Sequence, residues 1–283
     1  MDIIYLAYFF VFYLGAIFGS FLNVFTAEIE PNVFEQKTNK TLFERLNRRS
    51  HCPKCKHKLS FFELFPIFSY ILLLGKCLKC RTKISFKYFF AEIFSGAIFS
   101  LMFCFLMNKY GSFLNYHLQI EFLYFIPVLS FLFIIFFFDL KHKVIPNLIL
   151  YPLFIFGLFY AIFDFKTLSF DFKNTFDVLV NAGSIALPIW AIYFVSKERA
   201  MGGADWKLVF ALGLFFENIF QELMFLFGSF FIGAFVSIFL LLLSRKNKLN
   251  SQVAFGPFIV LSFVLTLFLE ISYFDFAELL TFV

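Results

Sequence analysis

The chain has 283 residues, of which 61% are hydrophobic, 24% aromatic and only 15% charged. Ordinary soluble domains are about 45–50% apolar and about 25% charged, so this composition excludes a soluble globular protein. The apolar runs are continuous and about 20 residues long, which excludes a membrane β-barrel with its short alternating segments. The net charge of +5 fits cationic loops at a membrane better than a nucleic-acid surface. We therefore expect an all-α polytopic membrane protein that does not bind nucleic acid.

Eight apolar segments predict transmembrane helices. In chain order they cover 3–25, 86–107, 121–138, 144–163, 176–195, 206–220, 223–243 and 252–270. No Lys or Arg precedes the first segment, so it is expected to remain as an anchor helix and not to be a cleaved signal peptide. In the sixth, only about ten apolar residues separate Lys207 from Glu217. Its helix should therefore begin inside the membrane, or the bilayer should thin around it.

The connecting segments alternate in positive charge. Of the 24 Lys and Arg residues, 13 lie in segment 26–88 and eight more lie in 139–143, 196–207 and 244–251. The intervening segments contain only Lys109, Lys166 and Lys173. Cytoplasmic loops are enriched in Lys and Arg, so this bias predicts that the first group of segments is cytoplasmic and that both termini are outside.

The large cytoplasmic loop contains two Cys-x-x-Cys pairs separated by 21 residues: Cys52 with Cys55, and Cys77 with Cys80. Each pair can form a tight knuckle that aims two thiolates at one ion, and two knuckles complete a tetrahedral sulfur shell, as in zinc ribbons. Neighbouring Lys and Arg residues should lower the pKa values of the thiols. The alternatives are four unrelated reduced thiols or a redox pair. Because a closed four-cysteine site has no open coordination position, we expect a structural zinc ion.

The chain is expected to divide into three parts. Residues 1–25 form the first transmembrane helix, 26–88 a cytoplasmic zinc-binding loop domain, and 89–283 a helical bundle in the membrane. A loop of about 60 residues buries little surface by itself, so a metal explains how it folds. Its apolar middle, Leu64–Leu74, is hydrophobic enough to enter the membrane interface.

Two aspartates lie at membrane depth, where charged groups are costly and usually functional. Asp139 follows the apolar run 131–138, and Asp205 begins the sixth segment, so both fall on the cytoplasmic side. Two carboxyls that share a proton form the acid–base pair of an aspartic protease, in which one activates water and the other protonates the scissile carbonyl. The alternatives are that each aspartate extends to the surface or pairs with an adjacent lysine, namely Lys141, Lys143 or Lys207.

Two glycines, Gly202 and Gly203, stand just before the second aspartate. Without side chains they allow backbone or substrate to approach closely, and they permit the turn that begins a helix inside the membrane.

Five motifs in order resemble those of the type IV prepilin peptidases, a family of membrane aspartic proteases with a GxGD motif. They are GAIFGSFLNV at 15–24, the double Cys-x-x-Cys loop, Asp139 followed at seven residues by Pro146-Asn147, MGGADWK at 201–207, and FGPF at 255–258. The resemblance spans roughly residues 10–260. The sequence departs from the family at Ala204, where the motif has a glycine.

The resemblance implies that Asp139 and Asp205 are catalytic and that the four cysteines hold zinc. It also implies that the second aspartate's site is shaped by Gly202, Gly203 and Lys207, and the first by Pro146 and Asn147. Family substrates are prepilins and pseudopilins of the bacterial inner membrane, cut at the cytoplasmic face between a short basic leader ending in Gly and a hydrophobic helix. Many members then methylate the new amino terminus with S-adenosylmethionine, which implicates the amino-terminal region and its Gly15, Gly19 and Asn23.

Three other classes remain open. Presenilin-like proteases also use two intramembrane aspartates, but their Pro-Ala-Leu motif is absent from this sequence. A proton-coupled carrier would use the carboxylates as a relay, and a membrane scaffold would use the zinc domain for docking. Substituting asparagine for either aspartate distinguishes these functions. A carrier would lose coupled flux, a peptidase would lose processing of its substrate, and a scaffold would lose neither.

Overall fold

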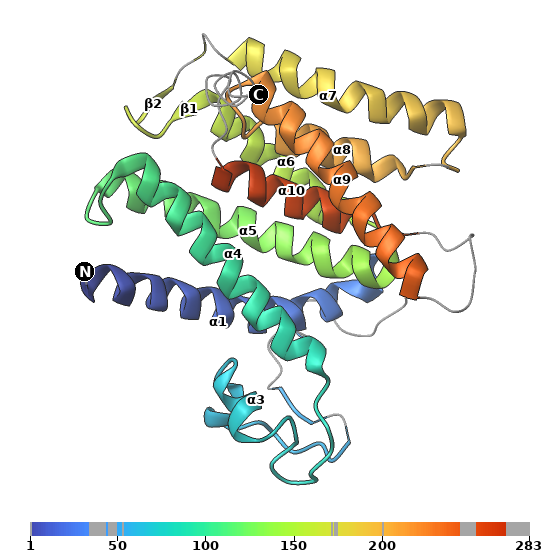
Figure 1. Ribbon diagram of the computed structural model, residues 1–283. Helices are drawn as coiled ribbons and strands as arrows, with labels where there is room; N and C mark the ends of the chain where they lie inside the picture. The colour runs from blue at the N-terminus through green and yellow to red at the C-terminus, as the bar shows by residue number, and fades with distance from the viewer. Residues whose placement is uncertain are drawn as a thin grey trace. The chain divides into compact units, whose positions relative to one another are not determined.

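The computed structural model describes residues 2–33, 44, 50–52, 54–170, 172, 175–199, 201–243 and 253–269. This part of the chain is mostly helical (Figure 1). Its elements are α1 (Asp2–Val33), η1 (Phe62–Leu64), α3 (Phe68–Leu72), α4 (Phe86–Tyr110), α5 (Tyr116–His142), α6 (Asn147–Ile162), β1 (Phe163–Asp164), β2 (Ser169–Phe170), α7 (Thr175–Ser196), α8 (Gly203–Gly213), α9 (Ile219–Leu243) and α10 (Gly256–Leu269). Each predicted apolar segment contains one helix, which confirms the all-α membrane fold. Met1 and residues 270–283, whose ends are predicted to be outside, lie beyond the described residues.

Five of the described helices, α1, α4, α5, α7 and α9, are long and apolar enough to cross a membrane. The apolar helices α6 and α10 are shorter. The sixth predicted segment, 206–220, differs in extent, because α8 begins at Gly203 and has 11 residues. At 1.5 Å per residue it spans about 16 Å, too short for a hydrocarbon core of about 30 Å. Two tight turns, in which Phe215 N donates to Leu212 O and Phe216 N to Gly213 O, end it.

The chain forms two compact units, Met1–Cys104 and Phe105–Val283. In the first unit, glycines allow α1 and α4 to approach closely. A Cβ atom at Gly15 would lie 2.7 Å from Phe99 Cβ, and one at Gly19 would lie 2.6 Å from Ser95 Cβ. Since real Cβ atoms do not come so close, GAIFGS is a helix-packing motif of the small-residue type found in membrane proteins.

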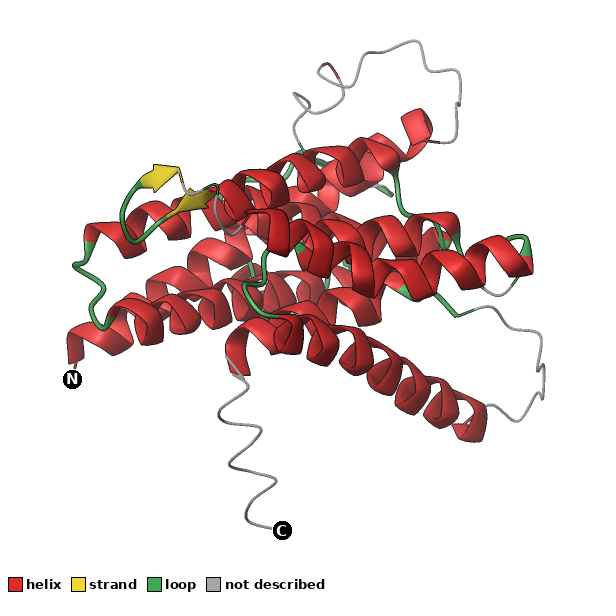
Figure 2. Cartoon of the chain, turned by 90° about the horizontal axis from the view of Figure 1, so that it is seen from above, coloured by secondary structure: helices red, strands yellow, loops and turns green. Residues whose placement is uncertain are grey.

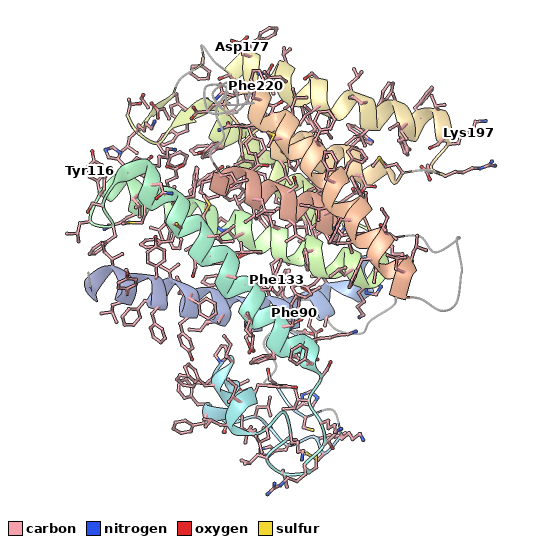
Figure 3. The ribbon with its side chains drawn as sticks, in the orientation of Figure 1. Phe90, Tyr116, Phe133, Asp177, Lys197 and Phe220 are labelled. Atoms are coloured by element: carbon pink, nitrogen blue, oxygen red, sulfur yellow. The ribbon has the colours of Figure 1, made fainter. Side chains whose placement is uncertain are left out.

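The second unit is built around α5, whose side chains Phe125, Leu132 and Phe138 are fully buried. Phe133, labelled in Figure 3, is also buried on this helix. α5 packs against α6 and α10, α8 packs against α6 and α7, and α9 packs against α10. Between α6 and α7, the strands β1 and β2 pair in an antiparallel hairpin (Figure 2).

A buried ion pair lies at the amino-terminal end of α5. The Glu121 carboxylate is fully buried and accepts hydrogen bonds from Lys109 Nζ at 2.9 Å, from Tyr110 Oη at 2.6 Å and from Tyr160 Oη at 2.9 Å. These donors satisfy a charge that would otherwise be very costly to bury. They join the end of α4 to α5 and α6, about 27 Å along α5 from Asp139 by the helical rise.

Candidate active site and metal centre

Asp139 lies in the last turn of α5. The helix is closed by Lys143, which adopts the left-handed conformation at φ 56° and donates its N–H to Asp139 O at 2.8 Å. The Asp139 side chain is only 4% exposed, and its Oδ2 accepts the backbone N–H of Gly256 at 2.9 Å. Because Gly256 is the first residue of α10, the carboxyl lies against a helix end whose backbone donors have no partner within the helix.

Gly256 is a site residue to which the sequence assigned no role, although it belongs to the FGPF motif. A Cβ atom there would lie 2.6 Å from Asp139 Oδ2 and 3.3 Å from Ile145 Cδ1. Only glycine therefore allows the end of α10 to approach the carboxyl. The two residues are far apart in the chain, so their contact was not visible in the spacing of motifs.

Asp205 lies in the first turn of α8 and is 8% exposed. Its Oδ2 accepts the backbone N–H of Gly202 at 3.1 Å, so the side chain caps the helix on which it sits. A Cβ atom at Gly203 would lie 3.0 Å from Tyr193 Cε2 on α7, so this glycine lets the start of α8 lie close to α7. The start of α8 is therefore fixed by the hydrogen bond between Asp205 and Gly202 and by its packing against α7.

The helices that carry the two aspartates share neighbours, because α5 and α8 both pack against α6 and α10. The negative charge of Asp139 lies close enough to act on the Asp205 carboxyl, so the two groups are near each other. Among the described residues, no donor contacts the second oxygen, Oδ1, of either carboxyl. Each carboxyl therefore has one oxygen anchored on a backbone amide and another that can bind water or a peptide carbonyl.

Three other expected site residues lie as follows. Pro146 is buried at the start of α6, where its carbonyl accepts from Ile149 N and Leu150 N. Asn147 is exposed. Lys207 places its Nζ 5.8 Å from the centre of the Trp206 ring.

The four loop cysteines come together as predicted. Their Sγ atoms all lie within 4.8 Å of one another, with 3.8 Å between Cys52 and Cys80 and 3.9 Å between Cys55 and Cys77. The two Cys-x-x-Cys pairs have the same backbone conformation. Lys56 N donates to Cys52 O and Arg81 N to Cys77 O, and both donors have positive φ. This cluster can hold a metal ion.

Hydrogen bonds change the pKa values of the thiols in this cluster. The hydrogen bond with the Thr82 side chain, followed by one with its backbone, lowers the pKa of Cys80 to about 6. Backbone hydrogen bonds, first at Cys55 and then at Lys54, lower the pKa of Cys52. The sequence attributed lower pKa values to the neighbouring cations, whereas hydrogen bonds are the main cause in the structure. Both effects favour the thiolate, which is the form that binds metal. At Cys55 the hydrogen bond with the His57 backbone acts in the same direction, but burial and hydrogen bonds with the other cysteines outweigh it and raise the pKa to about 11.

The amino-terminal residues that the resemblance linked to methylation, Gly15, Gly19 and Asn23, all lie on α1. Gly15 and Gly19 pack against α4, as described above. The Asn23 Nδ2 atom is buried and has no hydrogen-bond partner among the described residues. A buried donor without a partner is unfavourable, so it marks a place where a ligand or water can bind.

Both units of the chain match known protein families. Residues 13–106 match the bacterial peptidase A24 N-terminal domain, and residues 126–238 match the type IV leader peptidase family. The chain is 30% identical over 273 residues to a prepilin leader peptidase/N-methyltransferase of Vibrio cholerae, covering 95% of this chain and 98% of that protein. It is 29% identical over 269 residues to the protein of that name in Neisseria gonorrhoeae, covering 88% and 86%. No solved structure matches the chain.

The two matched regions follow one another as the amino-terminal and catalytic parts of one kind of protein, and the similarity extends over nearly the whole length of the Vibrio cholerae relative. The chain therefore belongs to the type IV leader peptidase family.

Proposed function

We propose that this protein is a membrane aspartic endopeptidase that removes the leader of type IV prepilin-like proteins, with Asp139 and Asp205 as its catalytic residues. The observation that carries the proposal is a pair of buried carboxyls within electrostatic range of each other, each anchored on a backbone amide and each with a free oxygen. The names of the relatives supply the substrate class. The cut is expected after glycine, at the cytoplasmic face.

In this mechanism the two carboxyls have different protonation states. Asp205 carries the shared proton, because the negative charge of Asp139 disfavours a second anion beside it, and donates this proton to the carbonyl oxygen of the scissile bond. Asp139 is ionised and takes a proton from the attacking water. The tetrahedral intermediate then collapses and the C–N bond breaks. The amine of the hydrophobic helix leaves with the proton that Asp139 took from the water, and the proton on the former carbonyl oxygen returns to Asp205.

The test is cleavage by the purified full-length protein in detergent. The substrate is a peptide with a short basic leader that ends in glycine, followed by a hydrophobic helix, and the products are identified by mass spectrometry. Two fragments separated after the glycine would support the proposal. An intact peptide in the presence of folded, metal-loaded protein would favour the carrier or the scaffold.

The acid role of Asp205 predicts a falling rate at alkaline pH. Because only the protonated carboxyl can act as the acid, the rate falls once the pH rises above the apparent pKa of the pair. Each further pH unit should lower kcat/KM about tenfold. The profile can be measured with the same peptide from about pH 6 to about pH 9. A flat profile over this range would contradict the assignment of Asp205 as the acid.

We further propose that the metal held by the four cysteines is zinc. A tetrahedral site with Zn–S bonds of about 2.3 Å has sulfur–sulfur edges of about 3.8 Å. Two of the Sγ–Sγ distances in the cluster, 3.8 and 3.9 Å, agree with this geometry. With four protein ligands, the ion would fold the loop and take no part in the cleavage.

Replacing one ligand should release the zinc. We expect one zinc ion per chain in the wild type and a Kd at least about 100-fold weaker in Cys77→Ser, because even partners outside the ligand shell change affinity about 10- to 100-fold. Elemental analysis after dialysis against a weak chelator measures this. Cys104→Ser is the matched control, since that cysteine lies outside the cluster and should leave the zinc content unchanged. Zinc retained by Cys77→Ser would contradict the site.

The names of the relatives also include N-methyltransferase, and we propose the same second activity here, with S-adenosylmethionine as methyl donor. The unpaired Asn23 donor beside the packed glycines supports a ligand site in this region. The test adds the methyl donor to the cleavage reaction. The product should then gain about 14 Da, the mass of one CH₂.

We place the protein in the bacterial inner membrane, with residues 26–88 as a cytoplasmic metal-binding domain and 89–283 as the bundle that carries the peptidase site. The positive charge of the loops supports this orientation, which puts both termini outside.

A further inference from the structure

The metal-binding subdomain carries an exposed apolar face. Five side chains of η1, α3 and the residues beside them are 54% to 80% exposed: Phe61, Phe62, Ile71, Leu72 and Leu74. We refer to these five as the apolar face. Soluble surfaces rarely expose so many large apolar side chains together, and such a patch marks an interaction site.

The turn beside this face contacts the membrane helices of the same unit. The rings of Phe65 and Phe68 lie 6.2 and 5.8 Å from the ring of Tyr13. Tyr13 lies within the candidate membrane span Ile4–Ile29 of α1, well away from its ends. Tyr70 of α3 stacks on Phe89 of α4, with 4.9 Å between ring centres. The segment therefore lies alongside parts of α1 and α4 that belong to candidate membrane spans.

Glu92 of α4 holds the backbone of the turn. Its Oε2 accepts the N–H of Ile67 at 2.7 Å, and Ile67 has a positive φ of 65°. Within a membrane, non-helical backbone is tolerated where protein groups satisfy its donors. The Glu92 carboxylate on α4 meets this requirement, because it accepts the N–H of Ile67.

The rest of the segment satisfies its own backbone. Ser69 N donates to Phe65 O, Ile71 N to Ile67 O, and Leu73 N to Ser69 O. Gly75 N donates to Tyr70 O. No charged residue occurs between Leu64 and Gly75, and the Glu63 carboxylate that precedes them accepts hydrogen bonds from Ser60 N and Ser60 Oγ, both at 2.9 Å. The segment is therefore compatible with lipid in its backbone and in its side chains.

The apolar face is also continuous with a lipid-facing surface. Phe9 and Ile17, one turn on either side of Tyr13 on α1, are exposed. Phe90, labelled in Figure 3, is exposed near the start of α4. In a protein with such helices these side chains face acyl chains. Phe61 of the apolar face packs against Phe65, with 5.1 Å between ring centres, and the Phe65 ring lies 6.2 Å from that of Tyr13, so these contacts join the face to α1.

Cations stand on both sides of the apolar stretch. Lys54, Lys56 and Lys58 precede it, and Lys76, Lys79, Arg81 and Lys83 follow it, all in the two cysteine knuckles. Basic residues beside a membrane-entering segment attract anionic head groups of the cytoplasmic leaflet. This charge pattern favours an anionic lipid surface over an apolar substrate helix as the partner.

We propose that the apolar face inserts into the cytoplasmic leaflet as a re-entrant segment, with Glu92 as its positioning residue and the knuckle cations on anionic head groups. The metal-binding subdomain is thereby bound to the membrane surface and is not surrounded by the cytoplasm on all sides. This inference is independent of the peptidase activity.

The experiment places a photoreactive benzoylphenylalanine at Leu72 of the full-length, metal-loaded protein. Position 79 carries the probe in the matched control, because Lys79 is exposed in the same subdomain but belongs to the cationic side. Both proteins are reconstituted in vesicles of phosphatidylcholine and phosphatidylglycerol, illuminated, and digested for mass spectrometry. We expect at least about tenfold more acyl-chain adduct at position 72 than at position 79.

Adducts at position 72 with residues 105–283, with a second copy of the chain or with an added prepilin-like peptide, in place of lipid, would overturn the proposal. Equal yields of lipid adduct at the two positions would also overturn it. A second pair of variants tests Glu92: with the probe at Leu72, Glu92→Ala should lose most of the lipid adduct, while Glu92→Gln, which can still accept the Ile67 N–H, should retain it. Metal content equal to wild type in both shows that the knuckles remain folded.

Discussion

Asp139→Asn and Asp205→Asn are each expected to lower kcat for leader cleavage by about 10³- to 10⁴-fold. An amide can neither accept the proton of the attacking water nor donate a carboxylic proton to the carbonyl, and general acid–base catalysis contributes about 10²–10⁴-fold for each group. The two losses should not add in the double variant, because the carboxyls work as one unit. The measurement is kcat with the leader peptide described above.

Folding should survive these substitutions, which separates a catalytic loss from a structural one. Asparagine keeps an oxygen that can accept the N–H of Gly256 or Gly202. The midpoint of thermal unfolding should therefore stay within a few degrees of the wild type. Asp177→Asn is the matched control, since Asp177 is exposed in the first turn of α7 (Figure 3), and it should cleave at the wild-type rate. Cleavage retained by either of the first two variants would exclude that aspartate from the catalytic pair.

Gly256→Ala is expected to lower kcat by about 100-fold with little change in KM. The new Cβ atom would lie 2.6 Å from Asp139 Oδ2, so either the carboxyl or the first turn of α10 must move. The hydrogen bond from Gly256 N to Asp139 would then break. A displacement of about 1 Å at a catalytic group can cost about 10²-fold in rate, which sets the size of the expected loss.

Gly183→Ala provides the comparison for this change. A Cβ atom there would meet no atom within 4 Å, and alanine is favoured over glycine inside a helix by about 1 kcal/mol. The control should keep the wild-type rate and be slightly more stable. Full activity in Gly256→Ala would show that the contact of α10 with Asp139 does not matter for catalysis.

Features encoded by short stretches of sequence were predictable. A helix in a bilayer needs about 20 apolar residues because its backbone must be satisfied internally, so composition alone located the helices. A Cys-x-x-Cys knuckle is equally local, since two thiols three residues apart can face one ion. The clustering of Cys52, Cys55, Cys77 and Cys80 confirms that prediction.

The limits of helix prediction appeared at α8. Apolar residues continue past Gly213, so hydrophobicity extended the segment to 220, whereas turns end the helix near Leu214. Hydropathy records whether a residue tolerates an apolar environment, but not whether the backbone there is helical. Packing of Gly213 against Ala182 of α7 belongs to the same region and involves a residue distant in sequence.

The sequence by itself determined the membrane fold, the metal-binding knuckles, the family resemblance and the two aspartates as candidates, since each depends on composition or on residues close along the chain. Only the tertiary structure decided that the end of α10 meets Asp139, that Asp139 lies within electrostatic range of Asp205, and that Glu92 anchors the turn at Ile67. These contacts join residues 25 to 117 positions apart. Such pairs come together through helix packing, which depends on the shapes of many side chains at once and leaves no periodic signal in the sequence.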